Sequence, residues 1–309
     1  MCGALLDGSL GNPELSDPRK VTSATSRRKH PKLAGKIGPF CLAALNAPIV
    51  SADAGLFWEV TCRALFGTAR DAAIYFDRSG LTHLLQPELG IFLEATGGGL
   101  HLATPIESFT LDSAKQKVTS ILLKNGEKKV FDDFVLAVPW AAAAKLLPMG
   151  DRAQQLAASF LPGPILGIHL WTDLPLAPDL ITGFLDSPLH WLFDRTSTLP
   201  DGHTGHLYAA VISAISDRID QSGKELLELV LSEIHRLLPG SRNCNVTHHV
   251  VYKSRDATFM GSPGEPLTRP GPVTSIQNLF LAGDWTQTGL PATIEGAVLS
   301  GLKSAFAIG

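Results

Sequence analysis

The sequence contains few cysteines, and those present do not form a motif. Cys2, Cys41, Cys62 and Cys244 stand far apart, without a CxxC pair and without a neighbouring histidine cluster. This spacing excludes the framework of a small disulfide-stabilised protein and offers no ligand set for a structural zinc ion or other metal. We therefore expect a reducing, cytoplasmic setting.

The chain also has no marked excess of basic or acidic residues and no long apolar run. The 26 basic and 29 acidic residues leave a net charge of −3, so no global basic field attracts nucleic acid. The longest uncharged window, residues 153–172, contains two glutamines, two prolines and a histidine, which disfavour a membrane-spanning helix. The N-terminus lacks the basic start and apolar run of a secretory signal. With 45% hydrophobic residues, the chain is expected to be globular, with at most peripheral contact with the inner membrane.

The first 36 residues differ in charge from the rest of the chain. They hold seven basic and three acidic residues, and residues 19–36 contain no acid at all. This composition predicts a basic, disordered leader over residues 1–36. A polybasic arm that contacts anionic lipid is the alternative.

Hydrophobic periodicity predicts a mixed α/β chain without internal repeats. Ser51 is the expected N-cap of its helix, Pro87 suits a first helical turn, and Gly240 suits a left-handed C-cap. Asn125–Gly126 predicts a hairpin turn. The expected helices are 39–48, 51–65, 87–96, 140–148, 224–238 and one from residue 292 onward. The expected strands are 101–112, 117–123, 130–139, 165–171, 190–193, 207–213, 245–253 and 278–282.

The segment with the clearest chemical meaning is the strand, turn and helix over residues 278–305. Gly283 lets the backbone approach a ligand closely, and Asp284 follows the carboxyl end of a strand, where α/β folds bind ligands. The helix that begins after Pro291 directs free N–H groups and a positive dipole end toward that turn, which favours a reduced flavin or a phosphate. Gly296 and Gly301 are expected to leave one helix face bare. An ordinary turn with an N-capping acid is the alternative.

The same residues resemble a known family. LAGDW followed by TGLPATIEGAVLSG is similar to the C-terminal flavin-binding signature of the FAD-dependent amine oxidase and desaturase superfamily. Within it, the chain most resembles the squalene-associated desaturases, the hydroxysqualene dehydroxylases of bacterial hopanoid synthesis. The segments CLAALNAP, FLEATGGGLHLATPIESF, PLHWLFDR, LYAAVISA and RDATF extend the resemblance over residues 37–309.

This resemblance implies an α/β fold of the FAD/NAD(P)-binding, amine-oxidase-like type with an interleaved substrate domain. The FAD-side pieces would be residues 91–145 and 270–309, and the substrate-side pieces residues 37–90 and 146–269.

The resemblance also assigns the cofactor-binding residues. Gly283 and Asp284 would contact the ribityl–pyrophosphate part of FAD. Thr293, Ile294 and Glu295 would lie at the helix start under the isoalloxazine ring. The backbone of Ile106 would hold the adenine. No catalytic residue is assigned.

One family feature is missing. The sequence contains no GxGxxG, and the triple glycine at residues 97–99 has the wrong spacing and follows an expected helix. The predicted fold therefore lacks the N-terminal dinucleotide-binding βαβ unit. Three alternatives follow: a truncated product, a separate polypeptide that carries the missing half, or a protein that no longer holds FAD.

The function implied is reductive dehydroxylation of hydroxysqualene to squalene, an apolar isoprenoid reaction. A phytoene-type carotenoid desaturase or an amine oxidase is the alternative within enzymes. A cofactor-free remnant that acts as a scaffold or hydrophobic-ligand binder is the alternative of another class. No GxSxG elbow, P-loop, HExxH or EF-hand supports other chemistry.

Other chemically suggestive side chains have simpler explanations. Aromatic residues on strand-like runs either line a polyisoprene tunnel or, as is more usual, belong to the core; these are Trp171, Trp191, Phe193 and Tyr208. His248 and His249 are adjacent, so on a strand they face opposite sides and cannot share a metal. Arg255 and Asp256 are expected to form a surface ion pair.

Overall fold

A computed structural model describes residues 31–68, 70, 73, 75, 80–114, 116–260 and 267–309. The chain divides into two compact units, and it crosses between them after residues 72, 100, 162 and 257. The first unit holds the described parts of 1–72, 101–162 and 258–309, and the second those of 73–100 and 163–257. These boundaries differ from those of the FAD-side and substrate-side pieces, whose division stays a prediction because compactness does not reveal which pieces contact a cofactor.

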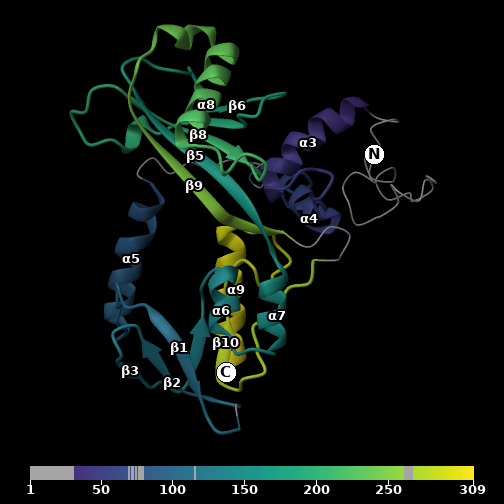
Figure 1. Ribbon diagram of the computed structural model, residues 1–309, viewed down its shortest axis with the longest axis vertical. Helices are drawn as coiled ribbons and strands as arrows, with labels where there is room; N and C mark the ends of the chain where they lie inside the picture. Colours follow the sequence, from purple (N-terminus) through teal and green to yellow (C-terminus); the bar gives the residue numbers. More distant parts are fainter. Residues whose placement is uncertain are drawn as a thin grey trace, which may run out of the picture. The chain divides into compact units, whose positions relative to one another are not determined.

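The first unit contains two small sheets and the helices around them (Figure 1). A two-stranded parallel sheet pairs β4 with β10, and an antiparallel sheet has the order β1-β2-β3. The hairpin between β2 and β3 turns at Asn125–Gly126 as predicted, and Gly126 has a φ of 85°. The strands of this unit are β1 (Ile106–Leu111), β2 (Val118–Leu123), β3 (Lys128–Lys129), β4 (Phe134–Leu136) and β10 (Leu279–Leu281). Its helices are α3 (Pro31–Leu45), α4 (Ala54–Leu65), α6 (Trp140–Leu146), α7 (Arg152–Ser159) and α9 (Ile294–Ile308).

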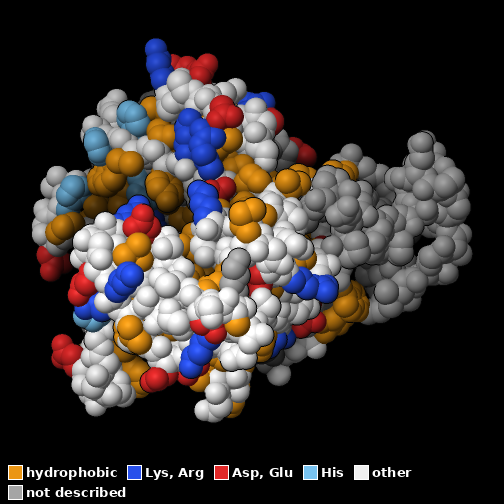
Figure 2. All heavy atoms as spheres, turned by 60° about the horizontal axis from the view of Figure 1, so that its bottom comes forward, with side chains coloured by type: hydrophobic (Ala, Val, Ile, Leu, Met, Phe, Trp, Pro, Cys, Tyr) orange, Lys and Arg blue, Asp and Glu red, His pale blue; other side chains and the backbone are white. Residues whose placement is uncertain are grey.

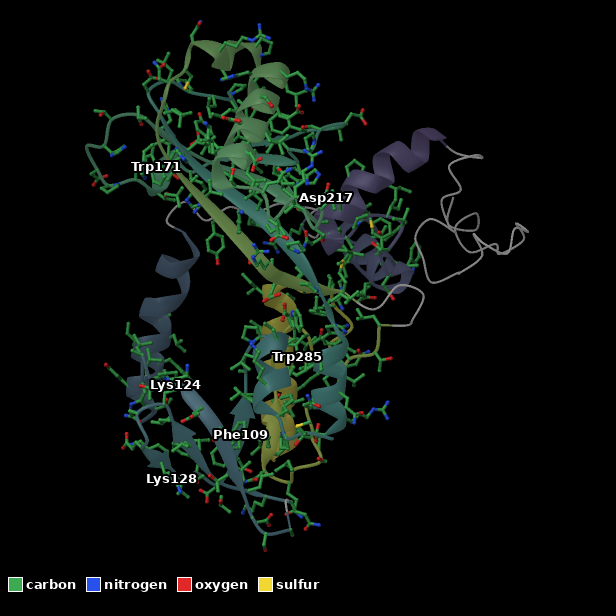
Figure 3. All side chains as sticks on the ribbon, viewed as in Figure 1. Phe109, Lys124, Lys128, Trp171, Asp217 and Trp285 are labelled. Carbon is green, nitrogen blue, oxygen red and sulfur yellow. The ribbon has the colours of Figure 1, made fainter. Side chains whose placement is uncertain are left out.

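The core of the first unit forms where these elements meet. Trp285, the largest side chain with no exposed surface, packs in a cluster with residues of β2, β4, α6, α7 and β10 (Figure 3). Asn278 ties β2 to the parallel sheet, because its side chain accepts from the Val118 N–H at 2.8 Å and donates to the Asp132 carbonyl at 2.8 Å. This buried amide fixes the register of segments that are far apart in the sequence.

The second unit is built on a five-stranded sheet with the order β6-β7-β8-β5-β9. Helix α8 (Gly223–Leu237) packs its apolar side, Leu226, Val230 and Ile234, into the same cluster as alternate residues of the sheet, such as Leu166 and Ile168. The strands are β5 (Leu161–Thr172), β6 (Ile181–Gly183), β7 (Trp191–Asp194), β8 (His206–Ser213) and β9 (Val246–Met260). The remaining elements are α5 (Leu81–Ala95) and the short 3₁₀ helices Thr196–Thr198 and Pro239–Asn243.

Several helix ends differ from the predictions. Asp53, not Ser51, caps α4 by accepting the Leu56 N–H at 2.8 Å, while the Ser51 hydroxyl donates to the Pro48 carbonyl. Helix α5 begins at Leu81, so Pro87 lies inside it. Gly240 is absent from the residues with positive φ, because a 3₁₀ helix follows α8 in place of a left-handed cap.

Other predictions are corrected as well. Helix α3 begins at Pro31, a favourable first position, so the last residues of the basic leader are helical, whereas residues 1–30 lie outside the described residues. The short elements α7, β3 and β6 and the two 3₁₀ helices were not predicted. Arg255 pairs with Asp220 at 2.6 Å and not with Asp256.

The surface shows no single-sign field on the face drawn in Figure 2, where basic and acidic side chains are interspersed. Within the described part of the chain, no group of His, Cys, Asp and Glu has the arrangement of a metal site. The described helices also include none with the length and apolar character needed to cross a bilayer.

Candidate functional site

The candidate site begins where β10 ends. Gly283 has a φ of 137°, a backbone conformation that residues with a side chain rarely adopt. A Cβ at this position would lie 2.6 Å from Nε1 of Trp285. The sequence analysis expected this glycine to admit a ligand. In the structure its missing side chain makes room for the Trp285 ring, so the glycine shapes the turn through its own neighbour.

Trp285 joins the two parallel strands at their carboxyl ends. Its indole Nε1 donates to the carbonyl of Val138, which follows β4, at 2.9 Å. The carboxyl ends of β4 and β10 therefore lie at one edge of the parallel sheet, the edge at which α/β folds bind ligands.

Helix α9 supports the turn with small residues. Its N-cap Thr293 accepts the Gly296 N–H at 3.1 Å, and Ser300 accepts the Gly283 N–H at 2.7 Å. Ser304 donates to the Leu281 carbonyl, so α9 lies directly against β10. The buried face consists of Gly296, Ser300 and Ser304, spaced four apart. The predicted face of Gly296 and Gly301 is wrong, because a spacing of five places Gly301 on the exposed side of the helix.

Two charged groups lie within the turn region. Asp284 is partly buried, and desolvation raises the pKa of its carboxyl despite the opposing charge of Arg269. Arg269, whose residue is 7% exposed, donates from Nη1 to the Leu290 carbonyl at 2.7 Å. Burial lowers the pKa of the Arg269 guanidinium, but this group stays protonated in proteins. The turn is therefore held beside a buried positive charge.

A cavity of about 610 Å³ opens beside the start of α9. The last part of α4 and the residues just after it form one side, and the turn before α9 forms the other. Thr293 and Glu295 border it, and the first N–H groups of a helix have no intrahelical acceptor. The lining residues are Val60, Cys62, Arg63, Ala64, Phe66, Gly67, Leu290, Pro291, Thr293 and Glu295.

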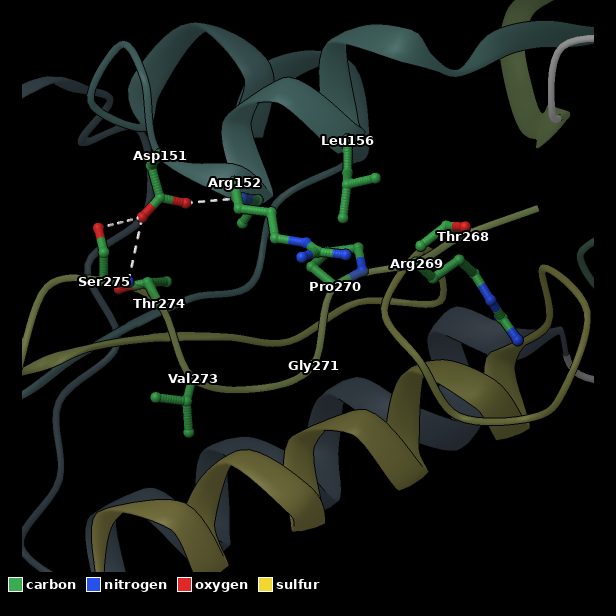
Figure 4. A pocket seen from close by; sticks show the side chains of 11 residues that line it. Asp151, Arg152, Leu156, Thr268, Arg269, Pro270, Gly271, Val273, Thr274 and Ser275 are labelled. Carbon is green, nitrogen blue, oxygen red and sulfur yellow. Dashed lines mark hydrogen bonds between the residues drawn. The ribbon is translucent and has the colours of Figure 1, made fainter. Parts of the chain in front are cut away.

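A smaller cavity of about 180 Å³ lies between the start of α7 and the loop before β10 (Figure 4). Asp151 caps α7 through the Ala153 N–H at 2.7 Å and also accepts from the Ser275 N–H at 3.1 Å. These hydrogen bonds give the Asp151 carboxylate a structural role, so we do not assign it to a ligand site in this cavity.

The structure brings most of the predicted site residues together. Gly283, Asp284 and Thr293 lie in the connection between β10 and α9, and Ile294 and Glu295 are the first two residues of α9. Ile106 lies elsewhere, at the first position of β1, where it pairs with Leu123. Its role at the adenine stays a prediction.

Arg269 was missed by the sequence analysis. It lies in a Pro/Gly-rich loop far from residue 290 in the sequence, so no local pattern indicated the contact.

The aromatic residues of the second unit divide between the two faces of the sheet. Tyr208 is fully buried in the core on the α8 side, as the core alternative predicts. Trp171, Trp191 and Phe193 alternate with core residues and so lie on the opposite face. Trp191 stacks on Phe193 with ring centroids 6.2 Å apart and covers Gly183, where a Cβ would come within 2.9 Å of its ring. This face is aromatic and only partly buried.

Comparison with known proteins agrees with this geometry. Residues 37–309 match the family described as flavin containing amine oxidoreductase. The chain belongs to this family. Hydroxysqualene dehydroxylase of Rhodopseudomonas palustris is 32% identical over 273 residues, which cover 87% of this chain and 60% of that protein. A 15-cis-phytoene desaturase of Synechococcus elongatus is 32% identical over 253 residues, or 76% of this chain and 52% of that protein.

The fold is also found among solved structures. An oxidoreductase from Methanosarcina mazei superposes with a TM-score of 0.72 at 17% identity, covering 93% of this chain and 68% of that one. The mixed α/β, amine-oxidase-like fold is thereby confirmed. The chain spans about 60% of the length of its dehydroxylase relative.

The residues present fit part of a flavin site. The positive end of α9, a buried guanidinium near the turn and a cavity beside the helix start suit an anionic, flat group such as a flavin. The sequence has no GxGxxG to receive the diphosphate in the usual way.

Proposed function

We propose that this protein is an FAD-dependent oxidoreductase that converts hydroxysqualene to squalene by reductive dehydroxylation. The observation that carries the proposal is the turn between β10 and α9 in a chain that belongs to the flavin family. The similarity to a hydroxysqualene dehydroxylase over 87% of the chain supports this substrate.

The residues of the turn would hold the cofactor. Gly283 and Asp284 would face its ribityl–pyrophosphate part, and Thr293, Ile294 and Glu295 would lie beneath its ring. When bound, the reduced flavin would supply the hydride for the new C–H bond, while the C–O bond breaks and the hydroxyl leaves as water with a proton taken from solvent. The chain contributes the positive end of α9, which favours negative charge nearby by about 0.3–1 kcal/mol in exposed settings and more when partly buried.

The substrate would bind on the aromatic face of the second unit. Trp171, Trp191 and Phe193 lie on the face opposite α8, and they present flat apolar surface on which an isoprenoid chain can lie. Because such a substrate dissolves in lipid and hardly in water, we expect the protein to work in the cytoplasm in peripheral contact with the inner membrane.

A separate polypeptide with a dinucleotide-binding βαβ unit would complete the site. Parallel sheets are normally covered on both faces and usually have more than two strands, whereas in the described part of the chain this sheet holds β4, β10 and a single bridge between Val273 and Phe280. The outer side of α9 also exposes an apolar row at a spacing of four residues, with exposures of 58%, 57%, 55% and 85% for Ile294, Val298, Leu302 and Phe306. Both features suit a further strand and helix.

Flavin retention and product analysis test the proposal. The purified chain is incubated with FAD, with and without a co-expressed βαβ polypeptide, and passed through gel filtration. Protein with retained flavin absorbance is given hydroxysqualene after its flavin has been reduced. In a parallel sample the flavin is left oxidised, and phytoene is added with a quinone as electron acceptor. The products of both samples are analysed by mass spectrometry.

Squalene as the product supports the proposal. Activity on phytoene alone would indicate a carotenoid desaturase, which the 32% identity to the phytoene desaturase motivates. Protein that stays colourless in both preparations would indicate the cofactor-free ligand binder.

A further inference from the structure

Arg269 is a buried cation whose contacts are made with the chain rather than with an acid. Its residue is 7% exposed, and the ion pairs among the described residues do not include it. Its side chain points away from Asp151 (Figure 4). Burying a guanidinium without a contacting carboxylate is costly, so its acceptors merit an explanation.

The acceptors are the carbonyls at the two ends of the segment Asp284–Leu290, which we call the turn and which follows β10. Nη1 donates to the Leu290 carbonyl at 2.7 Å and approaches the Asp284 carbonyl at 3.4 Å. The neighbouring Pro270 carbonyl accepts the N–H of Gln287, in the middle of the turn, at 2.8 Å. Residues 269 and 270 therefore hold the turn at three points.

The guanidinium is kept in place from its other side. Its carbon lies 5.9 Å from the centroid of the Phe259 ring, and that ring packs on Phe160 at 5.0 Å. The charges of Asp53 and Asp284 act on it electrostatically. The side chain thus has an aromatic support and a fixed set of acceptors, and its positive charge lies within the structure that precedes α9.

We propose that Arg269 is a positioning residue that holds the Asp284–Leu290 turn closed and provides positive charge for the anionic part of the flavin cofactor. The charge role rests on the proposed function, whereas the positioning role does not. Nη1 bonds both carbonyls while the planar guanidinium lies over the Phe259 ring, so lysine replaces the charge but not this planar packing.

Hydrogen exchange of the chain without added flavin tests the positioning role. In Arg269→Met, amides of residues 284–290 are expected to exchange at least tenfold faster, while peptides of α8 stay unchanged. Arg269→Lys is expected to show a local increase of the same kind. Arg152→Met, which removes an exposed arginine on α7 that borders the same small cavity, is the matched control and should match the wild type.

The outcomes separate the alternatives. Unchanged exchange of the turn in both Arg269 variants would overturn the positioning role. If Arg269→Met unfolds throughout, the local effect in Arg269→Lys decides, because lysine keeps the buried charge.

A flavin titration tests the charge role with the same variants. FAD affinity is expected to fall at least tenfold in Arg269→Met. In Arg269→Lys it is expected to stay close to the wild-type affinity, although the amides of residues 284–290 still exchange faster in this variant. Equal loss in both variants would overturn the charge role. A wild-type chain that binds no FAD, even with the βαβ polypeptide, would refute the proposed function and the charge role together, while the exchange result would still decide the positioning role.

Discussion

Replacement of Gly283 by alanine tests whether this residue shapes the site through Trp285. The φ of 137° belongs to a region that residues with a side chain rarely adopt. Holding alanine there costs of order 1–3 kcal/mol. In addition, the new methyl group would lie 2.6 Å from Nε1 and 2.7 Å from Cδ1 of Trp285.

Trp285 cannot easily move to relieve this contact. It has no exposed surface, and its Nε1 is bonded to Val138. Forcing extra atoms into a packed core costs about 1–3 kcal/mol. Because partial relaxation relieves both effects together, we expect Gly283→Ala to lower the free energy of unfolding by roughly 3 kcal/mol.

Denaturant and thermal unfolding, followed by circular dichroism, measure this loss. A change of 3 kcal/mol corresponds to a fall in the midpoint temperature of about 6–12 °C for a unit of this size. Gly301→Ala is the matched control. Gly301 lies in α9, the helix that packs against β10, and it has open space around its Cβ position. Alanine there should raise stability by up to about 1 kcal/mol. A Gly283→Ala protein as stable as the wild type would show that the turn relaxes freely and that Trp285 does not fix it.

Three further predictions concern other parts of the chain. Asn278→Ala removes two buried hydrogen bonds to Val118 of β2 and one to the Asp132 carbonyl before β4, and it should cost roughly 3 kcal/mol in denaturant unfolding. Ser222→Ala breaks the capping box of α8 and should cost about 1 kcal/mol, seen as a lower thermal midpoint. Burial raises the pKa of the Cys41 thiol to about 12 from 9.0, so its contribution to stability is complete below pH 9 and declines as the pH rises toward 12. Native-state alkylation at pH 8 should accordingly leave Cys41 unmodified, as peptide mass analysis would show.

The sequence predicts those elements whose signals are local. Helix α8 has an apolar row that repeats at helical spacing, and the turn at Asn125–Gly126 needs only a residue pair that tolerates positive φ. The candidate site residues from Gly283 to Glu295 lie close together in the sequence, and their role at the cofactor stays a prediction. In each case the physical cause lies within a few residues of its effect.

Features that depend on competition or on distant partners were not predictable in this way. Ser51 and Asp53 are both suitable caps, and Ser51 is taken up by a local turn in which its hydroxyl donates to the Pro48 carbonyl, which leaves Asp53 as the cap. Helix α7 is short, and one capping acid with a few alanines gives little periodic signal. The pairing of Asp220 with Arg255 requires the loop between β8 and α8 to lie against β9, which no segment reveals alone.

The electrostatics of the site could not be predicted from the sequence, because Arg269 reaches the turn from a separate loop. From the sequence, Asp284 is the evident charge of the turn, and an acid beside an anionic cofactor would oppose binding. In the structure, desolvation favours the neutral form of Asp284, and the cation that the turn encloses comes from a loop 15 residues earlier. Arg269 and the positive end of the α9 dipole therefore place positive charge beside the acids of this region, Asp284 and Glu295. This positive charge suits an anionic dinucleotide although the most visible residue of the turn is an acid.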